Sequence, residues 1–250
     1  MKLSHADLIS PIPYRTNIGS IKSPTLREIW ELGYDKYNLY LRFLLLTPNK
    51  YCSEKSALHE WYYGLSDDDR QHVTILDICT IDKELAVIMQ DILNFFFVET
   101  VEWDRENEIF ILKDEYSNEI RGVINNKIIN NVINVICQLN GLSIDENVDK
   151  IKNKKAKNIM EKLLAGRKKM QQTQTSNKDN ELDNLVSSVA NKHPNLNIIN
   201  IWDLTISQFW DAFRRMVNNS IYDLSFSNVS VWGNESKQFK INDWYSNITN

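Results

Sequence analysis

Residues 197–219, NIINIWDLTISQFWDAFRRMVNN, carry the clearest structural pattern in the chain. After Thr205 the apolar residues recur at intervals of three and four, the spacing that places them on one face of an α-helix. The members of this face are Ile206, Phe209, Trp210, Phe213, Met216 and Val217. The pattern predicts an amphipathic helix in the C-terminal part of the chain.

Both ends of this helix carry signals of their own. Thr205 stands at the N-cap position, and Gln208 three residues later completes the pattern of a capping box. The arginine pair at 214–215 suits a last helical turn, where positive charge complements the helix dipole. The asparagine pair at 218–219 suits a C-terminal stop. We therefore expect the helix to begin after Thr205 and to end at the asparagine pair.

Composition and charge divide the chain into three parts. Seven Gly and five Pro in 250 residues are few, which favours long helices over a turn-rich β-sandwich. Residues 149–180 hold ten Lys/Arg against three Asp/Glu, whereas residues 1–148 hold 14 against 23 and residues 181–250 hold five against seven. We predict an α+β, mostly α protein: a helical N-terminal domain with a small β-hairpin (1–148), a basic, partly mobile linker helix (149–180) and a small helical C-terminal module (181–250).

The N-terminal domain is expected to consist mainly of helices. The first twenty residues, broken by Pro and Gly, predict an extended arm. Ser23 and Pro24 predict the N-cap and first position of a helix that bends at Gly33 and is ended by Pro48. Thr80 is expected to cap a later helix. The further expected elements are helices near 58–63, 69–79, 81–97, 128–139 and 181–193, a β-hairpin of strands 98–103 and 108–113, and a third strand near 119–124.

The cysteines and the most apolar stretch of the sequence indicate in which cellular compartment the protein is expected. Cys52, Cys79 and Cys137 form no CxxC pair, and Cys79 and Cys137 lie inside apolar patterns typical of buried small hydrophobes. An odd count without a signal peptide favours a reducing cytoplasm. The most apolar window, residues 81–98, contains four charged residues, which argues against a membrane span. We expect a cytoplasmic protein with no membrane partner.

No motif in the sequence points to catalysis. The chain has no GxxxxGK[ST], GxGxxG, HExxH or GxSxG, and its four histidines lack metal-ligand spacing. The aspartates at 67–69 follow Ser66, which fits a capped first helical turn better than a metal site, because a metal needs converging ligands. Acidic residues on and around the hairpin, Glu99 and Glu102 among them, leave a metal-dependent hydrolase as a third hypothesis. We expect no catalytic residues, no metal and no cofactor.

The basic segment allows two interpretations. Its cations are Lys154, Lys155, Lys157, Arg167, Lys168 and Lys169. Clustered Lys and Arg bind nucleic acid by releasing counterions, but no aromatic residue occurs between Tyr116 and Trp202 to stack on bases. A solvated linker helix, or one that docks on an acidic protein surface, fits the same residues.

The aromatic face of residues 205–217 also has two interpretations. Such faces usually pack into the protein's own core, but Trp and Phe also form the centres of protein interfaces. The residues expected to form either the core or a partner-binding surface are Trp202, Phe209, Trp210, Phe213 and Arg214. Trp30 and Trp61 are expected in the core.

Three stretches of the chain resemble a family of phage proteins. They are SPTLREI (23–29), KNKKAKNIMEKLLAGRKK (152–169) and NIINIWDLTISQFWDAFRR (197–215). Together they resemble tail-morphogenesis proteins, similar to tail assembly chaperones, of phages and prophages of Gram-positive bacteria. Ile201 to Thr205, followed by Phe209 and Phe213, carry most of the likeness, which is one of pattern rather than of a catalytic signature.

The resemblance implies a non-enzymatic helper in the host cytoplasm that binds the tape-measure or tail-tube protein during assembly. It is also compatible with self-association and with a role as a structural component of the virion. The alternative is a nucleic-acid-associated phage factor acting through residues 150–169.

Overall fold

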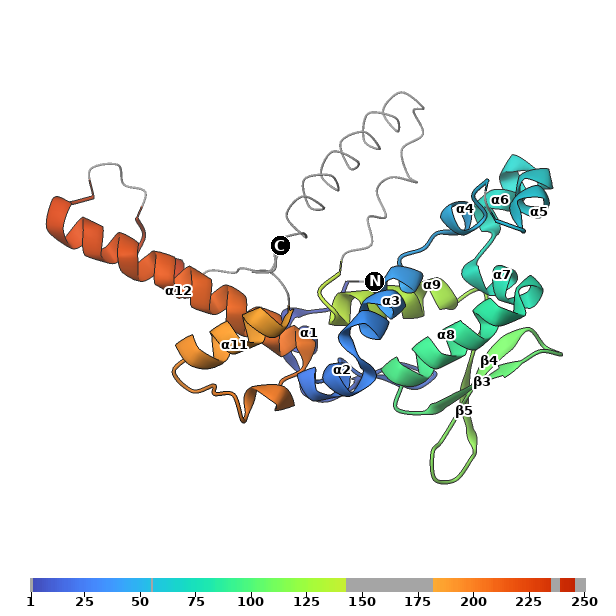
Figure 1. The fold of residues 1–250 in the computed structure, drawn as a ribbon, viewed down its shortest axis with the longest axis horizontal. Helices are drawn as coiled ribbons and strands as arrows, with labels where there is room; N and C mark the ends of the chain where they lie inside the picture. The colour runs from blue at the N-terminus through green and yellow to red at the C-terminus, as the bar shows by residue number, and fades with distance from the viewer. Residues whose placement is uncertain (1, 55, 143–181, 235–238, 246–250) are drawn as a thin grey trace. The chain divides into compact units, whose positions relative to one another are not determined.

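The computed structural model describes residues 2–54, 56–142, 182–234 and 239–245 (Figure 1). These residues form an α+β structure that is mostly α, as predicted. The chain divides into two compact units. The first consists of Met1–Ser143 with Thr205–Ser207, and the second of Ile144–Leu204 with Gln208–Asn250.

Most elements of the first unit are short helices. They are α1 (His5–Ile9), α2 (Leu26–Leu32), α3 (Tyr34–Leu44), α4 (Pro48–Tyr51), α5 (His59–Gly64), α6 (Asp67–His72), α7 (Ile75–Ile81), α8 (Lys83–Phe96) and α9 (Ile129–Leu139). Between α2 and α3 the chain turns at Gly33, whose φ of 91° suits glycine, so the predicted bend is confirmed. Ser66 caps α6 by accepting a hydrogen bond from the Asp69 amide, also as predicted.

Two antiparallel sheets accompany these helices. β1 (Tyr14–Arg15) pairs with β2 (Ser20–Ile21), and β3 (Thr100–Asp104), β4 (Ile109–Lys113) and β5 (Ile120–Ile124) form a meander in that order. The predicted hairpin and third strand are therefore confirmed. α8 packs along β3, the strand opposite β5 in the meander (Figure 1).

Side chains of α8 occupy the outer edge of β3. Asn94 accepts from the Val101 amide at 2.8 Å and donates to the Val101 carbonyl oxygen at 2.8 Å. Gln90 accepts from the Trp103 amide at 2.8 Å. The free backbone groups of an edge strand can pair with a strand of another molecule. The side-chain amides of Asn94 and Gln90 bond to these groups on β3 and so prevent such pairing.

The other outer strand, β5, lies against the turn between β1 and β2. A Cβ added at Gly122 would overlap the backbone of Ile18, so this approach requires glycine. The Ser20 amide donates to both carboxylate oxygens of Glu99, at 3.1 and 2.9 Å. The N-terminal β-ribbon is thereby fixed to the three-stranded sheet.

The core of the first unit is formed mainly by α8 and α9. Their buried residues are Leu85, Ala86, Met89, Ile92, Leu93 and Phe96 of α8, and Ile129, Val132, Ile133, Val135, Ile136, Cys137 and Leu139 of α9. Val101, Phe110 and Leu112 extend it beneath the sheet. Cys79 and Cys137 are buried as predicted, and Cys52 is buried with them.

The extended N-terminal arm is not observed. Ser4 and Asp7 form a capping box that starts α1, with the Asp7 amide donating to Ser4 Oγ at 3.2 Å. Thr16 then closes the β1–β2 turn, since its hydroxyl donates to the Gly19 carbonyl at 2.6 Å. Local side-chain hydrogen bonds therefore order a segment whose Pro and Gly content indicated an arm.

Several predicted helix boundaries are wrong because other capping residues are used. The N-cap of α2 is Thr25, in a capping box with Glu28, so Ser23 and Pro24 precede the helix. Pro48 begins α4 rather than ending α3. The expected helix at 69–79 is two helices, α6 and α7, separated because Thr74 caps α7. Asp82, not Thr80, caps α8 by accepting from the amides of residues 84 and 85.

Trp30 is not a core residue. Its side chain is 71% exposed, because the seven-residue α2 buries the face that carries Leu26 and Ile29. Trp61 is half-buried. Trp30 lies four residues after buried Leu26, so its exposure shows that the covered face of α2 is narrow.

The second unit contains α11 (Leu182–Lys192), η2 (Ile201–Asp203), α12 from Gln208 onward, and η3 (Asp243–Tyr245). α12 spans Ile206–Trp232 and is much longer than predicted. The asparagine pair at 218–219 does not end it. It ends before Gly233, whose φ of 81° and amide bond to the Val229 carbonyl form a helix stop.

The first residues of α12 belong to the first unit. The Ile206 amide donates to the Pro24 carbonyl at 2.8 Å, and Thr205 forms an isolated β-bridge with Thr25. Ser207 Oγ and Ser23 Oγ donate to the same carbonyl, that of Leu139, at 2.6 and 3.0 Å. The start of α12 is therefore held by backbone contacts just before α2 and by a hydroxyl hydrogen bond at the end of α9.

Candidate interaction surface on the C-terminal helix

The aromatic residues at the start of α12 differ in burial. Phe209 is fully buried, which assigns it to the interior rather than to a surface. Trp210 and Phe213 are half-buried, and their rings pack edge to face at 6.0 Å between centroids. Arg214 is exposed, and its Nε donates to the Trp210 carbonyl at 3.2 Å. Trp202, in η2, is also half-buried. Trp202, Trp210, Phe213 and Arg214 are called the aromatic surface below.

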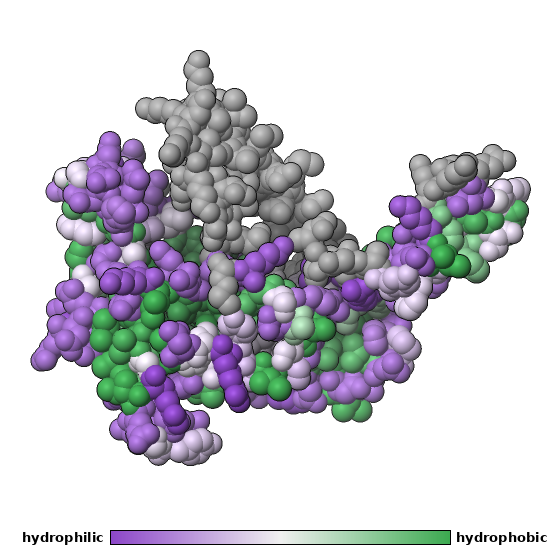
Figure 2. Space-filling model, turned by 180° about the vertical axis from the view of Figure 1, so that it is seen from behind, coloured by the Kyte–Doolittle hydropathy of each residue, from purple (hydrophilic) through white to green (hydrophobic). Residues whose placement is uncertain are grey.

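Phe209 is the last residue of α12 whose side chain is buried. None of its residues from Trp210 to Trp232 is buried, although apolar residues recur to the end of the helix. Figure 2 shows hydrophobic residues on the surface near the far end of α12, at the right of the view. A helix with an uncovered apolar face is typical of an interaction surface.

The described tail, residues 239–245, folds back onto one side of this part of α12. Phe239 packs on Tyr222 and Phe226, with ring centroids 5.3 and 6.1 Å apart. Asn218 donates to the Asp243 carbonyl and Tyr222 to the carbonyl of residue 241, both at 3.2 Å. A hollow of about 550 Å³ lies between helix and tail. The tail thus covers one side of the helix.

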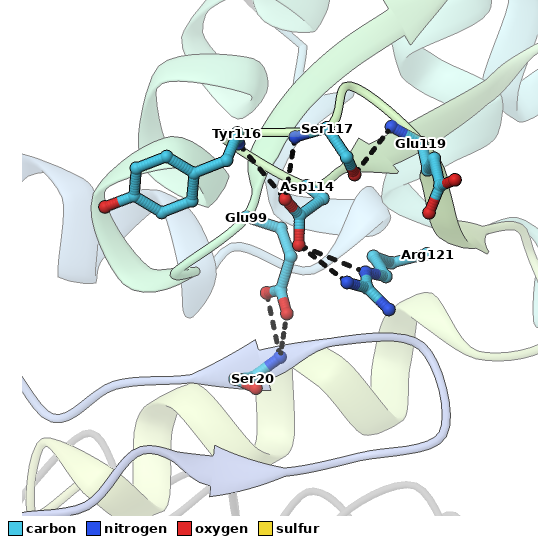
Figure 3. A network of polar contacts seen from close by, with 7 residues as sticks. All are labelled: Ser20, Glu99, Asp114, Tyr116, Ser117, Glu119 and Arg121. Carbon is cyan, nitrogen blue, oxygen red and sulfur yellow. Dashed lines mark hydrogen bonds and ion pairs between the residues drawn. The ribbon is translucent and has the colours of Figure 1, made fainter.

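The acidic residues of the hairpin are used structurally. Glu99 binds the Ser20 amide, and Glu102 forms an ion pair with Lys113. Asp114 accepts from the amides of Tyr116 and Ser117 and from the Arg121 guanidinium at 2.8 Å (Figure 3). Glu99 and Asp114 thus point to different partners. In the described part of the chain no group of three His, Cys, Asp or Glu side chains is placed to hold a metal ion.

The shifted pKa values have structural causes. Backbone hydrogen bonds from the β4–β5 turn and the Arg121 guanidinium hold the pKa of Asp114 well below its usual range. Asn107 lowers the pKa of Asp104 in the same way. Burial raises the pKa of the Cys79 and Cys137 thiols to about 12, which is the opposite of what activates a nucleophilic cysteine.

The predicted basic residues Lys154, Lys155, Lys157, Arg167, Lys168 and Lys169 all lie outside the described residues. The structure therefore adds nothing to the two interpretations of that segment. Sequence reasoning also missed the distal half of α12, because it took the asparagine pair as the helix end. The available signal was Gly233, a glycine placed directly after a run of apolar residues at helical spacing.

The C-terminal part of the chain is similar to a phage-derived domain. Residues 169–249, about a third of the chain, match the family model described as the YomV second domain, a domain of Bacillus prophage type. Comparison with curated proteins and with solved structures gave no significant match. The domain match agrees with the phage origin that the resemblance implied, and it does not address tail assembly. Among the described helices, none combines the length and the apolar content needed to cross a bilayer.

Proposed function

We propose that this chain is a non-enzymatic phage morphogenesis factor that acts in the manner of a tail assembly chaperone. It binds the tape-measure or tail-tube protein in the host cytoplasm and releases it during assembly. The observation that carries the proposal is the aromatic surface of Trp202, Trp210, Phe213 and Arg214 within the region similar to the phage-derived domain.

Two features support a protein partner for this surface. Trp and Arg are the side chains most often found at the energetic centres of interfaces, and here they adjoin on one helix. The half-buried rings of Trp210 and Phe213 are held edge to face, so little side-chain entropy is lost when a partner covers them. An uncovered aromatic surface of this kind fits reversible binding of an apolar segment in another protein.

The test is a binding assay with the purified full-length chain and the tape-measure and tail-tube proteins encoded in the same phage genome. Trp210→Ala and Arg214→Glu are expected to weaken binding at least about tenfold, since each changes the centre of the surface. Trp30→Ala is the matched control, because it removes an exposed indole from α2 in the first unit. This control is expected to bind as the wild type does.

Four outcomes would contradict the proposal. Neither tail protein binds, or Trp210→Ala and Trp30→Ala bind equally well. Recovery of the chain as a stoichiometric part of mature virions would indicate a structural component instead. Capture of nucleic acid that is lost after reversing the charges of Lys154, Lys168 and Lys169 would favour the nucleic-acid alternative.

A further inference from the structure

The hollow between α12 and the tail is lined by side chains of two kinds. Those of the first kind hold the tail. Asn218 and Tyr222 donate to the carbonyls of residues 243 and 241, at 3.2 Å each. Asn234 donates to the Phe239 carbonyl at 2.9 Å, and the Phe239 ring packs on Tyr222. These side chains are already engaged and form the wall of the hollow.

Three polar side chains of the second kind have no partner in the described part of the chain. Ser225, Asn228 and Trp232 follow one another at intervals of three and four residues, so they lie along one side of α12. Neither the Ser225 hydroxyl, nor the Asn228 amide, nor the Trp232 indole N–H bonds to a described residue. Two nearby serines that do not line the hollow, Ser227 and Ser230, each donate to the carbonyl four residues earlier at 2.8 Å. The hollow therefore presents a hydroxyl, an amide and an indole N–H to a ligand.

The charge of the hollow favours an uncharged ligand. None of its described lining residues is Lys, Arg or His, so a phosphate or carboxylate would meet no cation. Its single acidic residue is Asp243, whose Oδ2 accepts from the Lys240 amide at 3.3 Å. A cationic ligand would therefore find one carboxylate, and that one is already engaged.

The lining combines flat apolar surfaces with these hydrogen-bonding groups. Trp232 is 80% exposed, and the rings of Tyr222 and Phe239 lie 5.3 Å apart. A volume of about 550 Å³ lies within the range of small-molecule sites, about 300–1,000 Å³. A purely apolar ligand would leave the three polar groups without partners. A pyranose sugar satisfies both requirements, because its ring C–H groups pack on an aromatic face and its hydroxyls both donate to and accept from an amide.

We propose that this hollow binds a neutral saccharide, with Trp232 as the stacking ring and with Asn228 and Ser225 as the groups that bond to sugar hydroxyls. A free sugar and one residue of a glycan present the same ring and hydroxyls, so both fit this chemistry. The inference is independent of the proposed function, which concerns the aromatic surface and a protein partner.

The first experiment titrates the full-length chain with glucose, galactose, N-acetylglucosamine, maltotriose and the trisaccharide of N-acetylglucosamine. The indole N–H resonances are followed by NMR, and Trp232→Phe identifies the resonance of Trp232. At least one saccharide is expected to shift this resonance saturably, with a Kd of about 10 mM or tighter. A monosaccharide that binds as well as its trisaccharide indicates a free sugar, whereas a trisaccharide that binds at least about tenfold tighter indicates a glycan.

The second experiment compares matched substitutions in the same titration. Asn228→Ala is expected to weaken binding at least about tenfold, whereas Asn219→Ala, on the same helix but outside the hollow, should bind as the wild type does. Ser225→Ala is expected to weaken binding about threefold or more. Its control is Ser227→Ala, whose hydroxyl bonds to the Asp223 carbonyl. None of these four side chains is buried, so the variants should fold, which far-UV circular dichroism checks.

Three results would overturn the proposal. None of the five saccharides shifts the Trp232 resonance at concentrations up to about 50 mM. Alternatively, Asn228→Ala and Asn219→Ala bind the same saccharide equally well. In the third case adenosine, an uncharged ligand with a planar base, binds at least about tenfold tighter than every saccharide, which would assign the hollow to a nucleoside.

Discussion

Asn94 is the residue whose replacement tests the packing of α8 on β3 most directly. Its side chain satisfies both backbone groups of Val101, a residue with no exposed surface, at 2.8 Å each. Asn94→Ala removes both hydrogen bonds and leaves a buried amide and a buried carbonyl without partners. Each such group costs about 1–3 kcal/mol, and alanine returns about 0.5 kcal/mol of helix propensity. We expect a loss of about 2–4 kcal/mol in unfolding free energy.

The assay is chemical unfolding combined with amide hydrogen exchange. The Val101 amide is expected to lose protection, while the Trp103 amide, held by Gln90, keeps most of its own. Asn131→Ala on α9 is the control, because it makes the same change at an exposed helical site. Equal unfolding free energies for the two variants, or unchanged protection of Val101, would refute the reasoning.

Asn94→Asp separates the accepting role of the amide from its donating role. A carboxylate accepts from the Val101 amide but has no proton to give to the Val101 carbonyl, so the variant is expected to be destabilised at neutral pH. Folding then favours the protonated acid and raises its pKa above the unfolded value. The lost stability should therefore return below about pH 4 and disappear as the pH rises through the folded pKa. A variant with no pH dependence relative to wild type would contradict the donor role.

Three further changes test other parts of the first unit. Gly122→Ala should cost about 1–3 kcal/mol in chemical unfolding, because its Cβ overlaps the backbone of the β1–β2 turn, whereas Gly64→Ala faces open space and should be neutral. Tyr37→Phe should cost about 1–3 kcal/mol, because the tyrosine hydroxyl donates to buried Asn140 at 2.7 Å. Burial raises the Tyr37 pKa, so this contribution holds below about pH 10 and is lost as the pH rises further; alkaline unfolding of the two proteins should converge. The lowered pKa of Asp114 makes its contribution present above about pH 4 and lost as the pH falls, so Asp114→Asn should remove that acid dependence and a carboxyl NMR titration should show the shift.

Local signals made much of the first unit predictable. The alternation around Val101 and Phe110 identified the hairpin, and the helical spacing of Ile129 to Leu139 identified α9. Ser66 followed by acids identified the cap of α6. Each of these patterns lies within one element, so no knowledge of distant contacts is needed. The proximal aromatic residues were identified for the same reason, although only the structure separates buried Phe209 from half-buried Trp210.

Contacts between distant residues were not predictable in this way. Whether Trp30 faces a core depends on which side of α2 is covered, and its spacing alone does not state this. The Ser20–Glu99 bond joins residues 79 positions apart. From the sequence alone, the clustered acidic residues of the hairpin suggested a hydrolase site. In the structure Glu99 accepts a hydrogen bond from the Ser20 amide and Asp114 accepts one from the Ser117 amide, so the two carboxylates do not share a site. A carboxylate's role depends on the donor opposite it, which the linear pattern does not contain.

The asparagines explain why the length of α12 was misjudged. An Asn costs a helix only about 0.5 kcal/mol relative to Ala, too little to end a helix that gains from packing. The side-chain amide of Asn94, within α8, bonds to backbone groups, as does that of Asn140, the C-cap of α9. Asn218 bonds in the same way to the backbone of the tail. Gly233 ends α12 because it alone of these residues adopts a positive φ. From residue 217 onward α12 runs past three Asn and four Ser, and the packing of Phe239 on Tyr222 and Phe226 is a tertiary contact that offsets the weak helix propensity of these residues.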